Sequence, residues 1–167
     1  MSRAFVDEDR HEEPKFVPPR APLPEGVTNY VTKNGLQELE EELKEWEQKL
    51  ELLAQKDKDE REKRIESNFI SDSMSLLRER IVSAVVVPVE NQPKDEIRFA
   101  AKVTLKIGKA AKQTLQIVGV DEADVKKKKI TFTSPLARAI MGKKVGESAT
   151  LILGGESRPI KILEIKY

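Results

Sequence analysis

The most informative feature of this sequence is what it lacks. There is no cysteine, which excludes disulfide scaffolds, cysteine-ligated zinc, iron–sulfur clusters and thiol catalysis. The single histidine, His11, lies in a charged, proline-rich stretch. Histidine-based catalytic triads and metal sites with several histidine ligands are therefore not expected. The longest apolar run, Ala84–Val87, is far short of the roughly 20 residues of a membrane span. No apolar stretch near the N-terminus is typical of a signal peptide, and we therefore expect a cytoplasmic protein.

What is present suits one domain or two small ones. The chain has 167 residues, of which 38% are hydrophobic and 35% charged. The net charge of +1 hides an asymmetry. Residues 1–31 carry four basic and six acidic side chains, residues 32–84 carry ten and fourteen, and residues 85–167 carry sixteen and nine, giving −2, −4 and +7. Such a division predicts modules with different partners, although a solvated charged surface explains either half taken alone.

Residues 1–28 are interpreted as a tail. Five prolines fall within eleven residues, and because proline fixes φ and removes a backbone donor, we expect an extended or disordered segment. A proline-rich ligand for some partner is the alternative. The five are Pro14, Pro18, Pro19, Pro22 and Pro24.

Residues 29–84 are predicted to form an antiparallel helical hairpin, a short coiled coil. Thr32 can cap the first helix. The polar run Lys56–Arg64 separates two apolar seams with alternating spacings of three and four residues, and is assigned to the tip. A first helix of about 24 residues would reach ~36 Å. The predicted hairpin core comprises Leu36, Leu39, Leu43, Trp46, Leu50, Leu53, Ile70, Met74, Leu77 and Ile81.

Residues 85–167 are predicted to form an α+β domain, a twisted antiparallel sheet with one short helix. Val85–Val87 is a short strand or edge, and perfect alternation over Ile97–Ile107 indicates a half-buried strand. Ser134, Pro135 and Gly142 delimit the helix as N-cap, first residue and C′. A hairpin turn is expected at Gly154-Gly155. The further strands are expected at Thr114–Val118, Lys129–Thr133, Ala149–Leu153 and Pro159–Ile165.

The order and spacing of several pieces in this domain resemble the C-terminal domain of the bacterial Gre (GreA/GreB) transcript-cleavage factors, over roughly residues 97–167. The start of the hairpin, Tyr30-Val31-Thr32 with Gly35 and Leu39, also resembles that family. The pieces in the C-terminal half are Ile117–Asp124, Ile130, Ser134–Ile140 and Gly142–Glu147.

The resemblance implies an FKBP-like domain that docks on the rim of the RNA polymerase secondary channel, with the coiled coil projecting down the channel. In the family an acidic tip helps to hold the second catalytic Mg²⁺, so that the polymerase cleaves its own backtracked RNA. The resemblance also implies polymerase contacts at the acidic loop and the short helix. The residues concerned are Asp121, Glu122, Asp124, Ser134, Pro135 and Arg138.

The sequence departs from the family at the tip. The family's Asp-Leu-Ser-Glu-Asn-like run is absent, and the nearest substitutes are Asp57, Asp59 and Glu60. They could share a Mg²⁺ with the polymerase, but interspersed lysines and arginines reduce the negative potential, and a solvated turn is the competing interpretation. The arm is about ten residues shorter than in the family, or ~15 Å. The relative Rnk is similar in having a short coiled coil and no cleavage activity.

Other candidates also have two interpretations. Asp121, Glu122 and Asp124 could bind a metal ion, but no second cluster completes the coordination sphere. The amides at Ser134-Pro135 could bind an anion or serve only as a helix start. Lys126–Lys129 could contact phosphates, but without interleaved aromatic residues base stacking is unsupported and a solvated loop is favoured.

Three functions therefore stand at this stage. The first is a non-enzymatic regulator of RNA polymerase that binds the secondary channel. The second is a full stimulator of transcript cleavage, and the third is an FKBP-like prolyl isomerase, for which the C-terminal half offers only Phe99, Phe132 and Tyr167 as aromatic residues. For the first we expect a monomer without an intrinsic cofactor, contacting nucleic acid only indirectly within the transcription complex and no membrane.

Overall fold

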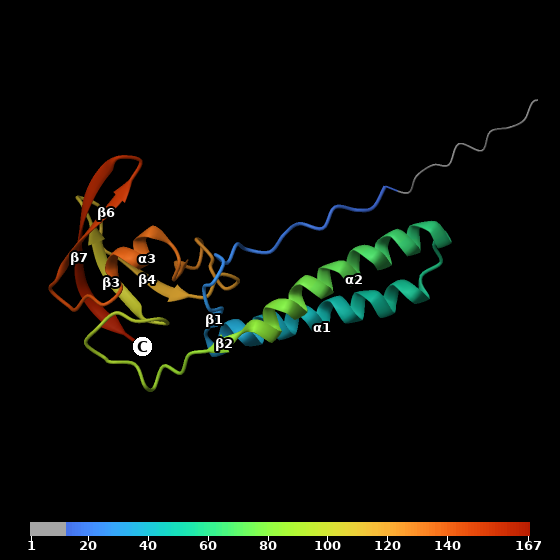
Figure 1. Cartoon of the computed structure of the whole chain (residues 1–167), viewed down its shortest axis with the longest axis horizontal. Coiled ribbons are helices and arrows are strands. Elements are labelled where there is room, and N and C mark those ends of the chain that lie inside the picture. The colour runs from blue at the N-terminus through green and yellow to red at the C-terminus, as the bar shows by residue number, and fades with distance from the viewer. Residues whose placement is uncertain (1–12) are drawn as a thin grey trace, which may run out of the picture.

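The computed structural model describes residues 13–167, which form a helical hairpin projecting from a sheet domain (Figure 1). Helices α1 (Lys33–Gln55) and α2 (Glu60–Ser83) lie side by side and antiparallel. The predicted cap is confirmed, because the Thr32 hydroxyl accepts a hydrogen bond from the Gly35 amide at 2.9 Å. With 23 residues, α1 is about 35 Å long.

The interior of the hairpin is a single apolar seam. Trp46 packs edge-on against Phe69, with ring centroids 6.0 Å apart, and the Lys49 ammonium lies 4.3 Å from the Trp46 centroid. Because two helices enclose little volume, half of the predicted core residues remain partly accessible. Leu39, Leu53, Ile70, Met74 and Leu77 are buried, and Leu36, Leu43, Trp46, Leu50 and Ile81 are half-buried.

The chain enters and leaves the hairpin through two short parallel strands. Strand β1 (Tyr30–Val31) pairs with β2 (Val85–Val86), which is the short strand expected there. The Val85 amide donates to the Asn29 carbonyl at 2.9 Å, and the Val87 amide donates to the Val31 carbonyl at 3.1 Å. These bonds hold both ends of the hairpin together at its base.

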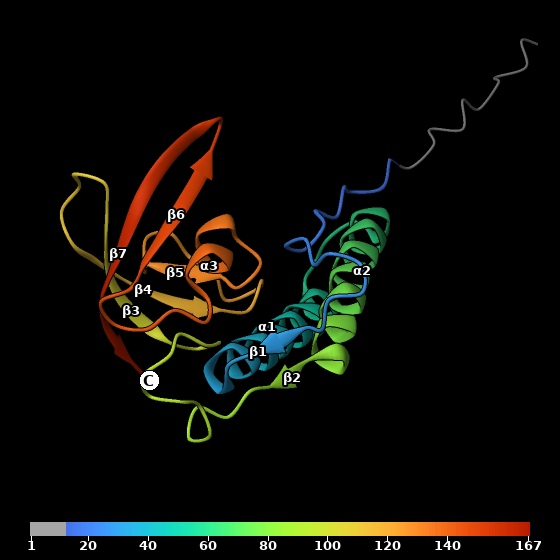
Figure 2. The ribbon, with the colours of Figure 1, turned by 60° about the vertical axis from the view of Figure 1, so that its left-hand side comes forward.

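The C-terminal sheet has five strands in the order β5-β4-β3-β7-β6, and the β6–β7 hairpin extends away from the other strands (Figure 2). The predicted turn at Gly154-Gly155 is confirmed, with φ of 56° and 80°. The predicted short helix is α3 (Pro135–Ile140), with Gly142 at φ 78° just beyond it. The strands are β3 (Lys102–Ile107), β4 (Gln113–Val118), β5 (Lys129–Thr131), β6 (Ser148–Leu153) and β7 (Glu156–Lys166).

The α+β fold class is confirmed, but two details differ from the sequence-based expectation. The sheet is mixed, because β5 runs parallel to β4, with Lys129–Thr131 opposite Gln116–Val118 in the second half of that strand. The strand expected from Ile97 begins only at Lys102. Ala100 has φ of 71°, and the Ala101 amide donates to the Arg98 carbonyl, so the chain turns there. The apolar alternation before Lys102 reflects burial in a turn and not a strand.

The N-terminal segment, residues 13–28, contains no helix or strand and runs alongside the hairpin (Figure 1). It is nonetheless in contact with the rest of the chain through Arg20, which donates to Glu42 on α1. The tail prediction for residues 1–12, including His11, lies outside the described residues. Within residues 13–167, no helix is both long and apolar enough to cross a membrane.

Candidate functional site

The hairpin tip is a short loop rich in charge. Asp57, Asp59 and Glu60 are exposed, and Asp59 precedes α2 without capping it through its side chain. Glu60 lies 3.5 Å from the Lys63 ammonium, so basic groups are interleaved with the carboxylates. Among residues 13–167 no group of three or more histidine, cysteine, aspartate or glutamate side chains is arranged to hold a metal ion. Any Mg²⁺ at this tip would need ligands from a partner.

At the other end of the hairpin, Glu122 joins the two domains. It lies in the loop between β4 and β5, and its side chain is buried. One carboxylate oxygen accepts from the Thr32 hydroxyl at 2.5 Å; the other accepts from the Lys129 ammonium at 2.8 Å and from the Asn34 amide at 3.2 Å. Burial lowers the pKa of Lys129, but the bond and charge of Glu122 raise it by more, giving a net increase.

Two glycines permit this close contact. A Cβ on Gly35 would lie 2.6 Å from a Glu122 carboxylate oxygen, and a Cβ on Gly119 would lie 2.6 Å from the backbone carbonyl oxygen of Tyr30. No real Cβ comes that near another heavy atom. Both glycines occur in the pieces that carry the family resemblance, and here they serve the junction between hairpin and sheet.

An aromatic cluster closes the same junction. Tyr30, from β1, packs against Phe99 and Phe132 of the sheet domain, with the three centroids 5.7–6.1 Å apart. Tyr167 is not part of this cluster, since its hydroxyl instead accepts from the Arg98 amide at 2.8 Å and donates to the Glu96 carbonyl at 2.6 Å. The cluster borders a shallow hollow of about 360 Å³.

Asp121, the residue before Glu122, is also engaged within the chain. Its side chain is only 6% exposed and lies 2.9 Å from Arg20 Nε and 3.6 Å from Arg80 Nε. Arg20 belongs to the N-terminal segment and Arg80 to α2. Asp121 and Glu122 therefore face other parts of this chain, which the clustering of their charges did not predict. In the sequence, the only hint of this junction was the presence of Gly35 and Gly119 in the segments that resemble the Gre family.

The remaining predicted residues lie on the surface of the sheet domain. The Ser134 hydroxyl caps α3 by accepting from the Ala137 amide at 3.2 Å, and Pro135 and Arg138 are exposed beside it. Asp124 accepts from the Lys126 amide at 2.9 Å and so closes its own loop. Next to Asp124, Val125 is 88% exposed at the start of the lysine run. Ser134, Pro135 and Arg138 thus lie together at α3, whereas Asp121 and Glu122 bond at the junction with the hairpin.

Comparison with known proteins gives a family match in this domain. The family described as transcription elongation factor, GreA/GreB, C-term, matches residues 92–167. Transcription elongation factor GreA of Hyphomonas neptunium is 37% identical over 101 residues, or 60% of this chain and 64% of that protein. GreA of Rhodopseudomonas palustris is 38% identical over 92 residues, or 54% of this chain and 58% of that protein. The chain thus matches less than two thirds of the length of these relatives.

Among solved structures, an elongation factor described as GreA/GreB from Nitrosomonas europaea covers 83% of this chain and 98% of that one, at 21% identity and a TM-score of 0.40. A structural similarity at this TM-score supports no conclusion about the chain. The family match and the curated relatives support a GreA/GreB C-terminal domain, and nothing in these comparisons supports a prolyl isomerase. Residues 92–167 therefore form a domain that matches the GreA/GreB C-terminal family, and the GreA relatives are similar to this chain over 54–60% of its length.

Proposed function

We propose that this protein binds bacterial RNA polymerase at its secondary channel and regulates transcription elongation, without catalysing a reaction itself. The observation that carries the proposal is a GreA/GreB C-terminal domain directly preceded by an antiparallel helical hairpin. That domain supplies the dock, and the helical hairpin projects from it as a long arm (Figure 1). We further propose that it acts as a monomer in the cytoplasm, where nucleic acid is contacted only through the transcription complex.

The docking surface in this proposal is the start of α3 with the neighbouring loop. Pro135 and Arg138 are exposed, and Arg138 makes no ion pair with any described residue. Asp124, which is half-buried in the loop before β5, is the third residue of the proposed docking surface. We leave out Asp121 and Glu122, because their carboxylates already pair with Arg20, Arg80 and Lys129.

The hairpin favours regulation over stimulated cleavage. An arm of about 35 Å ends in Asp57, Asp59 and Glu60, and these carboxylates alternate with cations. Their exposure at the far end supports the second candidate function, in which the tip shares a Mg²⁺ with the polymerase and stimulates cleavage of backtracked RNA. One assay distinguishes a regulator from a stimulator of transcript cleavage.

That assay is transcript cleavage in a reconstituted, backtracked bacterial RNA polymerase complex with Mg²⁺. A regulator should bind the complex and compete with GreA without stimulating cleavage. Stimulation that disappears when Asp57, Asp59 and Glu60 are replaced by alanine would support the second function instead.

Docking is tested separately with Arg138→Glu in a binding titration against core polymerase. The matched control is Arg158→Glu, which makes the same charge change at an exposed arginine on β7. We expect the first variant to bind more weakly and the control to bind like the wild type. Equal binding by all three proteins would overturn the assignment of this surface.

A further inference from the structure

The N-terminal segment crosses the junction between the hairpin and the sheet domain and contacts both. Arg20 donates two hydrogen bonds to the Glu42 carboxylate on α1, at 2.9 and 3.0 Å, and a third from Nε to Asp121 in the β4–β5 loop, at 2.9 Å. The Arg20 side chain is 19% exposed. One guanidinium thus connects a helix, a loop of the other domain and the segment that carries it.

A second arginine strengthens this connection from α2. Arg80 Nε lies 3.6 Å from the other Asp121 oxygen, and the Arg80 guanidinium also donates to the Ala21 carbonyl of the segment. That Asp121 oxygen is buried and has no hydrogen bond of its own. Both guanidinium groups therefore compensate a carboxylate that would otherwise be a costly buried charge.

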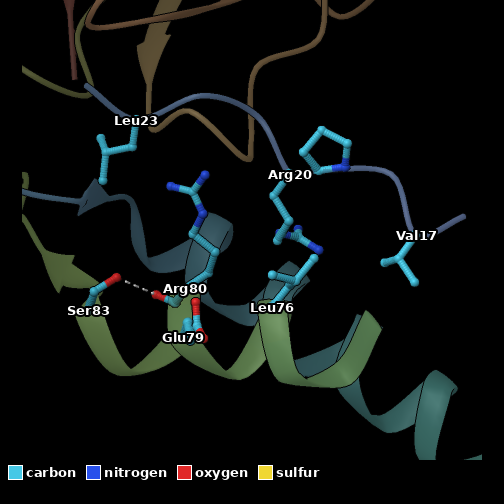
Figure 3. Close-up of a pocket in the computed structure, with 8 residues that line it drawn as sticks. Val17, Arg20, Leu23, Leu76, Glu79, Arg80 and Ser83 are labelled. Atoms are coloured by element: carbon cyan, nitrogen blue, oxygen red, sulfur yellow. Dashed lines mark hydrogen bonds between the residues drawn. The ribbon is translucent and has the colours of Figure 1, made fainter. Parts of the chain in front are cut away.

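The segment spans a hollow and is not packed tightly onto the helix. Figure 3 shows Val17, Arg20 and Leu23 above α2, with Leu76, Glu79 and Arg80 below them, and the space they line measures about 630 Å³. The polar contacts of Arg20 and Arg80 connect the segment to the hairpin across this space.

The contacts of Glu122 and of Arg20 hold α1 at two different points along its length. The contacts of Glu122 hold α1 at its first turn, beside Thr32. Glu42 lies ten residues further along the chain, about 15 Å up the helix axis. A contact at one point of a rod leaves it able to swing, whereas a second contact at a distance restricts its angle.

We propose that Arg20 is a positioning residue that fixes the angle at which the hairpin leaves the sheet domain. Within the proposed function, on which this consequence rests, the angle determines whether the hairpin points into the channel when the sheet domain docks. Arginine suits the task because its planar fork can meet two carboxylates at once, which a lysine ammonium cannot do in the same geometry.

The absence of cysteine makes the angle directly measurable. Spin labels on Gln55→Cys, at the tip, and Thr150→Cys, on β6, would be the only labels in the full-length chain, and both positions are exposed. Pulsed electron paramagnetic resonance measures the distance distribution between the two labels. The doubly labelled proteins compared are the wild type, Arg20→Ala, Glu42→Gln and the double variant.

The expected result is a shifted and broader distribution in Arg20→Ala and in Glu42→Gln. The double variant should show no change beyond Arg20→Ala, because that substitution already removes the contact with Glu42 as well as the one with Asp121. Arg20→Lys should fall between wild type and Arg20→Ala. The matched control, Arg78→Ala, removes an arginine–glutamate pair within the hairpin, to Glu47 at 3.3 Å, and should leave the distribution unchanged.

An unchanged distribution in both Arg20→Ala and Glu42→Gln would overturn the proposal, and so would a change in the control equal to theirs. Because Glu42→Gln alters only the helix surface, it keeps the test decisive if Arg20→Ala folds poorly. The measurement needs no polymerase, so its failure is distinct from failure of the proposed function. A wild type that binds no polymerase, with broadened variants, would remove the function and leave the positioning role standing.

Discussion

The base and the tip of the hairpin belong to the same two helices, yet their side chains have opposite surroundings. At the base, Glu122 is buried among Thr32, Asn34 and Lys129, and a methyl group would not fit at Gly35 or Gly119. At the tip, Asp57, Asp59 and Glu60 face solvent. Burial without correct pairing is costly, whereas exposed charge is tolerated in almost any order.

The difference indicates where the two ends are constrained. The base must meet another domain in one geometry, so each polar atom there needs a partner at a set distance. The carboxylates of the tip are exposed, so its sequence can change with little effect on the fold. The geometry of the arm is therefore constrained at its base, whereas its tip places few demands on the fold.

The largest effect is expected from Glu122→Ala at the base. It leaves the Lys129 ammonium, whose side chain is 17% exposed, without its nearest carboxylate, and it removes the acceptor of Thr32. We expect a loss of about 3 kcal/mol in the free energy of unfolding, as for one partner of a buried pair. Urea unfolding measures it, with the exposed Glu156→Ala as control. A loss no larger than the control's would contradict a buried role.

Next is Gly119→Ala, which places a methyl group against the Tyr30 carbonyl. Because backbone cannot move aside easily, we expect a destabilisation of about 1–3 kcal/mol. Gly35→Ala should cost less, since its neighbour is the end of the Glu122 side chain. Thermal unfolding of the two variants side by side checks the order, and a reversed order would show that the Glu122 carboxylate is held more rigidly than the β1 backbone.

A smaller, pH-dependent effect is expected at Glu42. Burial raises the pKa of Glu42, but the hydrogen bonds and charge of Arg20 lower it by more, so the net pKa is below its ordinary value of 4.5. The stabilisation from this pair is therefore fully present above about pH 4.5, and is lost as the pH falls through the lowered value. The difference in unfolding free energy between wild type and Glu42→Gln should shrink over that range. A constant difference would show that charge is not the cause.

The smallest effect is expected at the tip. Replacing Asp57, Asp59 and Glu60 together by alanine should leave the free energy of unfolding unchanged within measurement error, because exposed charges contribute little. Fluorescence of Trp46, the only tryptophan, reports on the hairpin directly. A clear loss of stability would erase the contrast between base and tip.

Local patterns in the sequence were sufficient for most of the elements. Both long helices, the Thr32 cap, α3 between Ser134 and Gly142, and the Gly154-Gly155 turn follow from spacing and capping chemistry, which involve neighbours along the chain. The resemblance of the C-terminal half to the Gre family also followed from the residues, and the family match to residues 92–167 agrees with it. The apolar alternation before Lys102 was misleading, because a buried turn and a strand can share that pattern.

The site was less predictable. Arg20 is 22 residues from Glu42 and 101 from Asp121, and no local pattern connects them. Likewise, three carboxylates within four residues look like one acidic patch, yet the structure gives Asp121, Glu122 and Asp124 three separate tasks. Side chains at adjacent positions can face different domains, so their partners emerge only when the chain has folded.

The sequence by itself determined the two-part architecture, because helix periodicity, caps and turns depend on contacts between near neighbours. It also carried the Gre resemblance, which resides in the order of short motifs. Only the tertiary structure decided that the acidic loop joins the hairpin to the sheet, that β5 runs parallel to β4, and that the N-terminal segment lies across the junction. These features depend on close contacts between residues distant in the chain, where a few tenths of an ångström separate a fit from a clash.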